Sequence, residues 1–115
     1  MFATFTSFAK QKTSAEKAKE KTEEMQKNLG LTAEQNKKIY EINLKTYTSI
    51  DDYEAKNDNK KLRKKQKDIM QDKRKDEFKK VLTAPQYKKY EEIKKAEKAK
   101  EKAEEQALEK LKKGK

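Results

Sequence analysis

The reactive side chains of this sequence are almost all lysines and carboxylates. It contains 30 Lys, 15 Glu and 6 Asp, but no His and no Cys. A His general base, a Cys nucleophile, a disulfide and the usual soft ligands of zinc or copper are therefore excluded. Carboxylates this frequent in a lysine-rich chain are normally solvated. We predict a protein that is not an enzyme, has no catalytic residue, and binds no metal and no cofactor.

The densest run of positive charge lies at residues 60–67. Long-range charge can capture an acidic partner, and neighbouring apolar side chains with an adaptable Met can retain it loosely. We name this candidate binding surface the basic-apolar segment, and it consists of Lys60, Lys61, Leu62, Arg63, Lys64, Lys65, Lys67, Ile69 and Met70. The alternative interpretation is an ordinary solvated helix face.

The net charge of the chain is +11. Such a field attracts nucleic acid, anionic lipid or acidic unfolded chains. Bidentate recognition of bases and phosphates favours Arg, but the chain has 2 Arg against 30 Lys. The charge excess therefore indicates diffuse attraction, and we expect no specific nucleic-acid partner.

The composition predicts extended helices. Ala, Glu, Lys, Leu and Arg, which are good helix formers, make up 65 of 115 residues. Leu, Ile, Val and Phe together make up only 17, so a large single core is excluded. The fold class is therefore all-α with thin apolar faces. Because thin faces are marginal in a monomer, we also predict a homodimer.

Two segments of the chain resemble each other. Residues 31–42 read LTAEQNKKIYEI and residues 82–93 read LTAPQYKKYEEI, with eight of twelve positions identical. Each begins with the pattern LTxxQ, which predicts a capping box: the Thr hydroxyl accepts from a backbone N–H, and the Gln reaches back to the Thr. We assign a structural role to these LTxxQ motifs, which are formed by Leu31, Thr32, Gln35, Leu82, Thr83 and Gln86.

Four helices follow from the caps and the apolar periodicity. They are expected at residues 14–28, 33–56 and 60–81, with a fourth that starts at Ala84. The second has the widest apolar face, which we interpret as core or dimer seam. The Lys/Glu/Ala-rich tail at 96–115 is expected to be a single helix or a frayed end.

The first nine residues, MFATFTSFA, carry no charge and end in the small-residue pattern Ser7-Phe8-Ala9. We interpret residues 1–9 as the remnant of a secretory signal peptide, which leaves a helical domain at 10–95 and the charged tail. The alternative is an apolar arm that docks on the fold. No other apolar run approaches the length of a membrane span, so we expect no transmembrane segment in the mature chain.

The pair Leu31-Thr32-x-x-Gln35 and Leu82-Thr83-x-x-Gln86 resembles the paired LTxxQ motifs of the Spy/CpxP family of periplasmic chaperones, over roughly residues 14–95. The resemblance implies a cradle-shaped antiparallel homodimer, exported to the periplasm of a Gram-negative bacterium. It also implies ATP-independent binding of unfolded client proteins on a basic, partly apolar concave face, as part of envelope stress protection. This sequence departs from metal-responsive relatives because it has no His or Cys.

Two other classes remain open. A basic helical protein associated with nucleic acid explains the net charge equally well, but it explains neither the paired motifs nor the signal-like Ser7-Phe8-Ala9. A structural coiled-coil spacer would dimerise and be helical, but it would have no effect on unfolded clients. Export of the chain would favour the chaperone over the nucleic-acid class.

The thin apolar faces generate a first prediction. We expect the midpoint of thermal unfolding to rise with protein concentration, because a homodimer must dissociate when it unfolds. Circular dichroism melts at several concentrations, together with sedimentation, measure this. A fully helical monomer whose midpoint is independent of concentration would contradict the dimer.

Overall fold

The computed structural model describes residues 11–113, which form four α-helices and no strand. Helix α2 spans Ser14–Leu29, α3 spans Ala33–Lys56, α4 spans Lys60–Val81 and α5 spans Ala84–Lys113. The all-α class and the four predicted helices are confirmed. The charged tail, as far as Lys113, is not a separate helix but the continuation of α5, which begins directly after Thr83 of the second LTxxQ motif. The proposed signal remnant at residues 1–9 lies outside the described residues.

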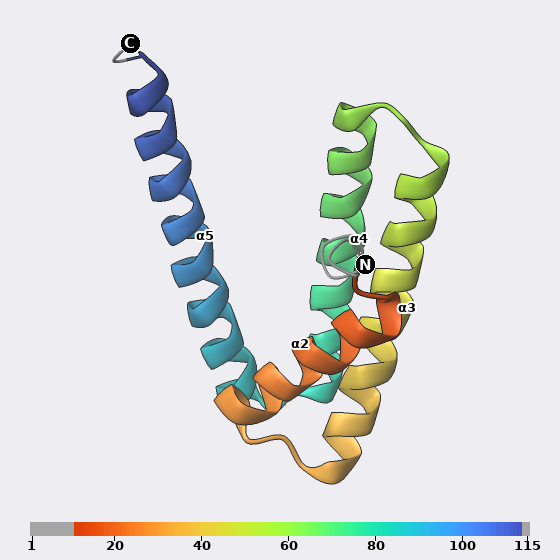
Figure 1. Cartoon of the computed structure of the whole chain (residues 1–115). Helices are drawn as coiled ribbons and strands as arrows, with labels where there is room; N and C mark the ends of the chain where they lie inside the picture. The colour runs from red at the N-terminus through yellow and green to blue at the C-terminus, as the bar shows by residue number, and fades with distance from the viewer. Residues whose placement is uncertain (1–10, 114–115) are drawn as a thin grey trace, which may run out of the picture.

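The helices form an open V (Figure 1). Helices α3 and α4 lie side by side as a hairpin, and α2 crosses them before it meets the start of α5. Helix α5 then diverges from α4, so these two helices form the arms of the V and the LTxxQ motifs lie near its apex. Beyond its first turns, α5 extends away from the rest of the molecule.

A single small core lies at the base of the V, where the helices meet. The side chains in this apolar cluster are all less than a tenth exposed: Met25, Leu31, Ile39, Phe78, Leu82 and Tyr90. The rings of Phe78 and Tyr90 join α4 to α5 in a T-shaped contact with centroids 5.3 Å apart. Both motif leucines therefore belong to the core, and the core holds α5 only by its first turns.

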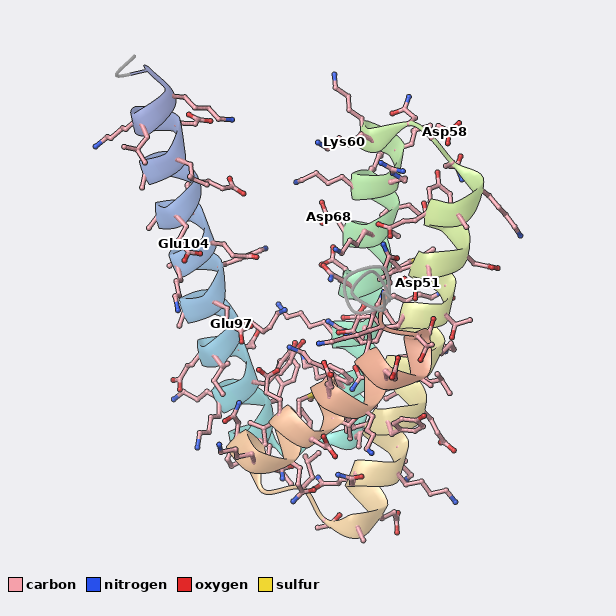
Figure 2. The ribbon with its side chains drawn as sticks, in the orientation of Figure 1. Asp51, Asp58, Lys60, Asp68, Glu97 and Glu104 are labelled. Atoms are coloured by element: carbon pink, nitrogen blue, oxygen red, sulfur yellow. The ribbon has the colours of Figure 1, made fainter. Side chains whose placement is uncertain are left out.

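The start of α2 is fixed to α3 by the carboxylate of Asp51, which is labelled in Figure 2. Ser14 Oγ donates to one carboxylate oxygen at 2.7 Å, and Lys17 Nζ donates to the other at 2.8 Å. Burial alone would raise the pKa of Asp51, but the two donors outweigh it and lower the pKa.

Capping boxes start α2, α3 and α5. At α3, Gln35 N–H donates to Thr32 Oγ1 at 3.1 Å and Thr32 N–H donates to Gln35 Oε1 at 2.9 Å. At α5, the corresponding distances between Thr83 and Gln86 are 3.3 Å and 2.9 Å. Gly30 ends α2 with φ = 64°, a left-handed conformation that favours glycine. These caps confirm the local structure that the LTxxQ motifs predict.

The two motifs also bind each other. Gln35 Nε2 donates to Gln86 Oε1 at 2.7 Å, and Gln86 Nε2 donates to Gln35 Oε1 at 3.2 Å. The second donor of Gln35 reaches Val81 O at 3.2 Å, at the end of α4. The second donor of Gln86 lies 3.4 Å from both Leu29 O and Gly30 O, at the end of α2. Each amide therefore satisfies both of its donors and accepts two hydrogen bonds.

This geometry explains why the motifs contain Gln. A Glu at the same position can cap its own helix, as Glu16 does at the start of α2. At position 35 or 86, however, a carboxylate would have no N–H for the facing motif. Two carboxylates there would also repel each other. Sequence reasoning gave the glutamines a minor capping role, whereas their hydrogen bonds join the ends of α2 and α4 to the starts of α5 and α3.

We therefore predict that Gln35→Glu destabilises the protein by about 2 kcal/mol, because two part-buried acceptors lose their donor. The matched control is Glu16→Gln in the capping box of α2, where the N3 side chain receives no hydrogen bond from a facing LTxxQ motif, and it should change stability by less than Gln35→Glu does. Thr32→Ala, which removes only a cap, should cost about 1 kcal/mol.

Urea unfolding of the three variants measures these differences. If Gln35→Glu and Glu16→Gln shift the unfolding midpoint equally, the contact between the motifs does not hold the apex.

Candidate functional site

The space between the arms of the V contains an open groove of about 680 Å³, here called the arm groove. It runs between α4 and the middle of α5, and Figure 2 labels Asp68 on one wall and Glu97 and Glu104 on the other. All but one of its lining residues are charged: Lys64, Lys67, Asp68, Gln71, Lys94, Glu97, Lys98, Lys100, Glu101, Glu104 and Glu105.

The walls of the arm groove differ in charge. The α4 wall presents Lys64 and Lys67 with a single acid, Asp68. The α5 wall contains four glutamates, spaced so that they share one face of the helix, together with three lysines: Lys94, Lys98 and Lys100. The ion pair that joins these arms within the described residues, Lys75–Glu91 at 3.5 Å, lies nearer the apex. In the part of the chain that the structure describes, the outer part of the arm groove is therefore not bridged by an ion pair between α4 and α5.

Towards the apex the arm groove adjoins an inner pocket of about 310 Å³. The two cavities share Gln71, Lys94 and Lys98. The inner pocket has five cationic and two acidic side chains among its lining residues, which are Gln71, Asp72, Arg74, Lys75, Tyr90, Glu91, Lys94, Lys95 and Lys98. Unlike the arm groove, it is strongly positive.

Arg74 is buried at the junction of three helices, with 2% of its surface exposed. Its Nη1 donates to Asn43 Oδ1 at 3.3 Å, and Asn43 Nδ2 in turn donates to Thr22 Oγ1 of α2 at 3.0 Å. The guanidinium carbon lies 5.4 Å from the ring centroid of Tyr47 and 5.6 Å from that of Phe78. These ring faces partly compensate its charge by cation–π attraction.

The positive potential of the inner pocket acts on Lys94. Burial lowers the pKa of this ammonium group, and the positive charges of Lys21 and Arg74 lower it further. Glu97 and Glu101 oppose the shift without cancelling it. Lys94 is therefore a cation held near other cations, an arrangement that a bound anion would relieve.

The basic-apolar segment forms the first turns of α4, where the helix divides its residues between two flanks. Lys64 and Lys67 line the arm groove. Ile69 and Met70 line a separate groove of about 400 Å³ between α3 and α4. Successive residues of a helix are rotated by 100°, so Lys64 and Ile69 point to different flanks of α4, whereas Lys67 and Met70 lie next to each other where the two flanks meet.

The remaining members of the segment are dispersed as well. Lys60, Lys61 and Lys65 are exposed, and Leu62 is 46% exposed. Arg63 is half-buried and donates to Asn57 O at 3.4 Å, at the turn before α4. The segment is therefore not one continuous patch, and its role in client binding stays a prediction.

Sequence reasoning missed both Arg74 and the α5 wall. Arg74 lies within the polar run 71–77, where nothing marks it as buried. The glutamates of the α5 wall recur at a spacing of three and four residues, which was a usable signal for a common face. The sequence-based interpretation of that region is only a charged tail.

Two further observations concern classes of site. No helix among residues 11–113 is both long and apolar enough to cross a membrane. Within the same residues, no group of three or more acidic, His or Cys side chains converges as a metal site would require.

Comparison with curated proteins and with solved structures found no match. The chain does match the family described as "Domain of unknown function (DUF4890)" over residues 6–90. The matched region includes both LTxxQ motifs and Arg74, and it ends at Tyr90, before α5 leaves the core. Because the match covers most of its length, the chain belongs to the DUF4890 family.

Proposed function

We propose that this protein is an ATP-independent, holdase-type chaperone that binds unfolded or aggregation-prone segments between its arms. The observation that carries the proposal is the arm groove, an open space bounded by two charged walls. An extended polypeptide with mixed side chains suits such a space better than a compact small molecule, which needs a largely apolar enclosed pocket.

The apolar groups on the arms are sparse, as loose retention requires. Leu62 and Ile69 on α4 are about half exposed, and Leu108 and Leu111 on α5 are more than half exposed. Singly placed apolar side chains contribute weak contacts, while lysines attract an acidic client over a longer range. Many weak contacts let a client bind and leave without nucleotide.

The likeness of the paired motifs to those of Spy/CpxP chaperones supports a periplasmic location and a role in envelope stress. The signal-like residues 1–9 point the same way. A homodimer would place two arm grooves in one assembly, which would give a client several attachment points. The structural spacer alternative requires a continuous apolar seam. The apolar residues of α5 beyond Lys98, however, are only three alanines and two leucines.

The second candidate is association with nucleic acid, and the exposed lysines 61 and 65, one helical turn apart on α4, favour it. A duplex could contact that outer surface of α4. The arm groove suits a duplex less well, because the four glutamates of the α5 wall outnumber its three lysines and would repel the phosphates. The two functions therefore use different lysines on the same helix.

Light scattering tests the proposal. We expect the protein, without nucleotide, to slow aggregation of a chemically unfolded acidic client at low salt. The effect should weaken at physiological ionic strength, where screening acts over about 8 Å. Replacing Lys60, Lys61, Arg63, Lys64, Lys65 and Lys67 by Gln should slow capture more than it speeds release, because long-range charge acts mainly on association.

A matched control keeps the total charge equal. It replaces six exposed lysines outside both cavities by Gln: Lys19, Lys27, Lys37, Lys80, Lys88 and Lys89. This variant should capture the client faster than the α4 variant. A smaller pair of variants, Lys64→Gln/Lys67→Gln and Lys61→Gln/Lys65→Gln, separates the arm groove from the outer surface.

Duplex DNA binding is measured in parallel with the same variants. Failure to slow aggregation at low salt, together with tight DNA binding that depends on Lys61 and Lys65, would replace the chaperone proposal with the nucleic-acid one.

A further inference from the structure

The side chain of Arg74 is a buried cation that lacks an anionic partner. No carboxylate within residues 11–113 forms an ion pair with it, although Asp72 and Glu91 line the same inner pocket. A charge removed from water is strongly disfavoured unless it is paired and fully hydrogen-bonded. The ring faces of Tyr47 and Phe78 supply only part of this compensation.

One edge of the guanidinium group is unused. Nη1 donates to Asn43, but Nε is buried with no acceptor, and Nη2 forms no hydrogen bond within the described chain. The Nε–Nη2 edge presents two parallel N–H groups. This is the geometry with which arginine holds both oxygens of a carboxylate, or two oxygens of a phosphate.

The surroundings of this edge favour an anion. Lys94 and Lys75 lie on the walls of the inner pocket, which opens into the arm groove. Of the two acids present, Glu91 is already paired with Lys75 at 3.5 Å, and both of these side chains are nearly half exposed. An exposed pair of this kind is weak, so an incoming anion can displace Glu91 from Lys75.

Access to Arg74 requires a small movement of α5. Arg74 lines the inner pocket together with Tyr90, Glu91 and Lys94 of α5, and α5 contacts α4 here through the Lys75–Glu91 pair and the Phe78–Tyr90 ring contact. Displacement of Glu91 removes the first of these contacts. Beyond Tyr90 no described residue of α5 is fully buried, although Ile93, Lys94 and Glu97 are half-buried, so a small shift of this part of α5 costs little core packing.

We propose that the inner pocket is an oxyanion site, in which Arg74 takes the two oxygens of a side-chain carboxylate from an acidic polypeptide, with Lys94 and Lys75 as flanking cations. This inference rests on the proposed chaperone function, because the arm groove is the path by which a client chain reaches the pocket. It adds a fixed anchor to an otherwise diffuse binding surface. Inorganic phosphate shares the same chemistry and serves as a probe.

Fluorescence anisotropy with a short labelled Glu-rich peptide tests the site, and the same peptide with Gln in place of Glu is the reference. Arg74→Met should weaken binding of the Glu peptide about tenfold, because a charge-assisted bidentate contact is lost. Arg74→Lys, which keeps the charge without the fork, should weaken it by a smaller factor.

The matched control is Lys73→Met, which removes the same charge from the adjacent residue of α4 but lines the other groove. It should leave binding within about twofold of the unmodified protein, since only diffuse attraction changes. Equal losses for Arg74→Met and Lys73→Met would overturn the site. Phosphate at constant ionic strength should compete with the peptide. Phosphate binding at Arg74 without any effect on the peptide would overturn the carboxylate assignment.

Circular dichroism confirms that each variant folds. If Arg74→Met does not fold, Arg74→Lys and Lys94→Met carry the test, and no loss of peptide binding in either would overturn the proposal. The aggregation assay separates the two hypotheses. If the unmodified protein suppresses aggregation, and Arg74→Met suppresses it equally and binds the peptide with unchanged affinity, the chaperone function stands and the oxyanion site is refuted.

Discussion

The reciprocal hydrogen bonds between Gln35 and Gln86 are the contact on which the V shape depends. They are formed by two residues that also cap their own helices, so one pair of amides defines two helix starts and holds them against each other. The same amides bind the last carbonyls of α2 and α4. Four helix ends therefore meet at one point, and the apolar core beside it can be small.

Under the proposed function, this arrangement separates stability from binding. Most of the buried apolar residues gather near the apex, with Ile50 further along α3, whereas the outer arms expose lysines, glutamates and a few leucines. A surface that binds unfolded chains must expose apolar atoms without collapsing on itself, and charged neighbours on a rigid helix provide that separation. The low apolar content of the sequence is thus compatible with a defined fold, because the hydrogen-bonded apex supplements the core.

Local signals predicted most of the fold. The Thr hydroxyls, the N3 side chains, Gly30 and the Asn-rich turn at 57–59 each act within a few residues, so the bounds of α2, α3 and α4 followed from sequence to within a residue. The contact between Gln35 and Gln86 joins residues 51 positions apart, and neither motif alone reveals it. Burial of Arg74 was equally hidden, because it depends on Asn43, Tyr47 and Phe78 from two helices. The residues of the basic-apolar segment are divided between two grooves and the exposed start of α4, because a run of neighbours in sequence surrounds a helix instead of lining one side.

The width of the arm groove follows from the same apex. Helix α5 has 30 residues, and at 1.5 Å per residue a rotation of about 10° at its start moves its far end by roughly 8 Å. Near the start of α5 this rotation is opposed by the Lys75–Glu91 ion pair, the Phe78–Tyr90 ring contact, the cation–π contact of Lys79 with Tyr87 and packing against α2. The amide pair fixes the position of the pivot, while the arms beyond it share no ion pair within the described residues. Segments of different bulk can therefore be accommodated by rotation of α5 without unpacking the core, and capture of an anion at Arg74 would act directly on the contacts that set the angle.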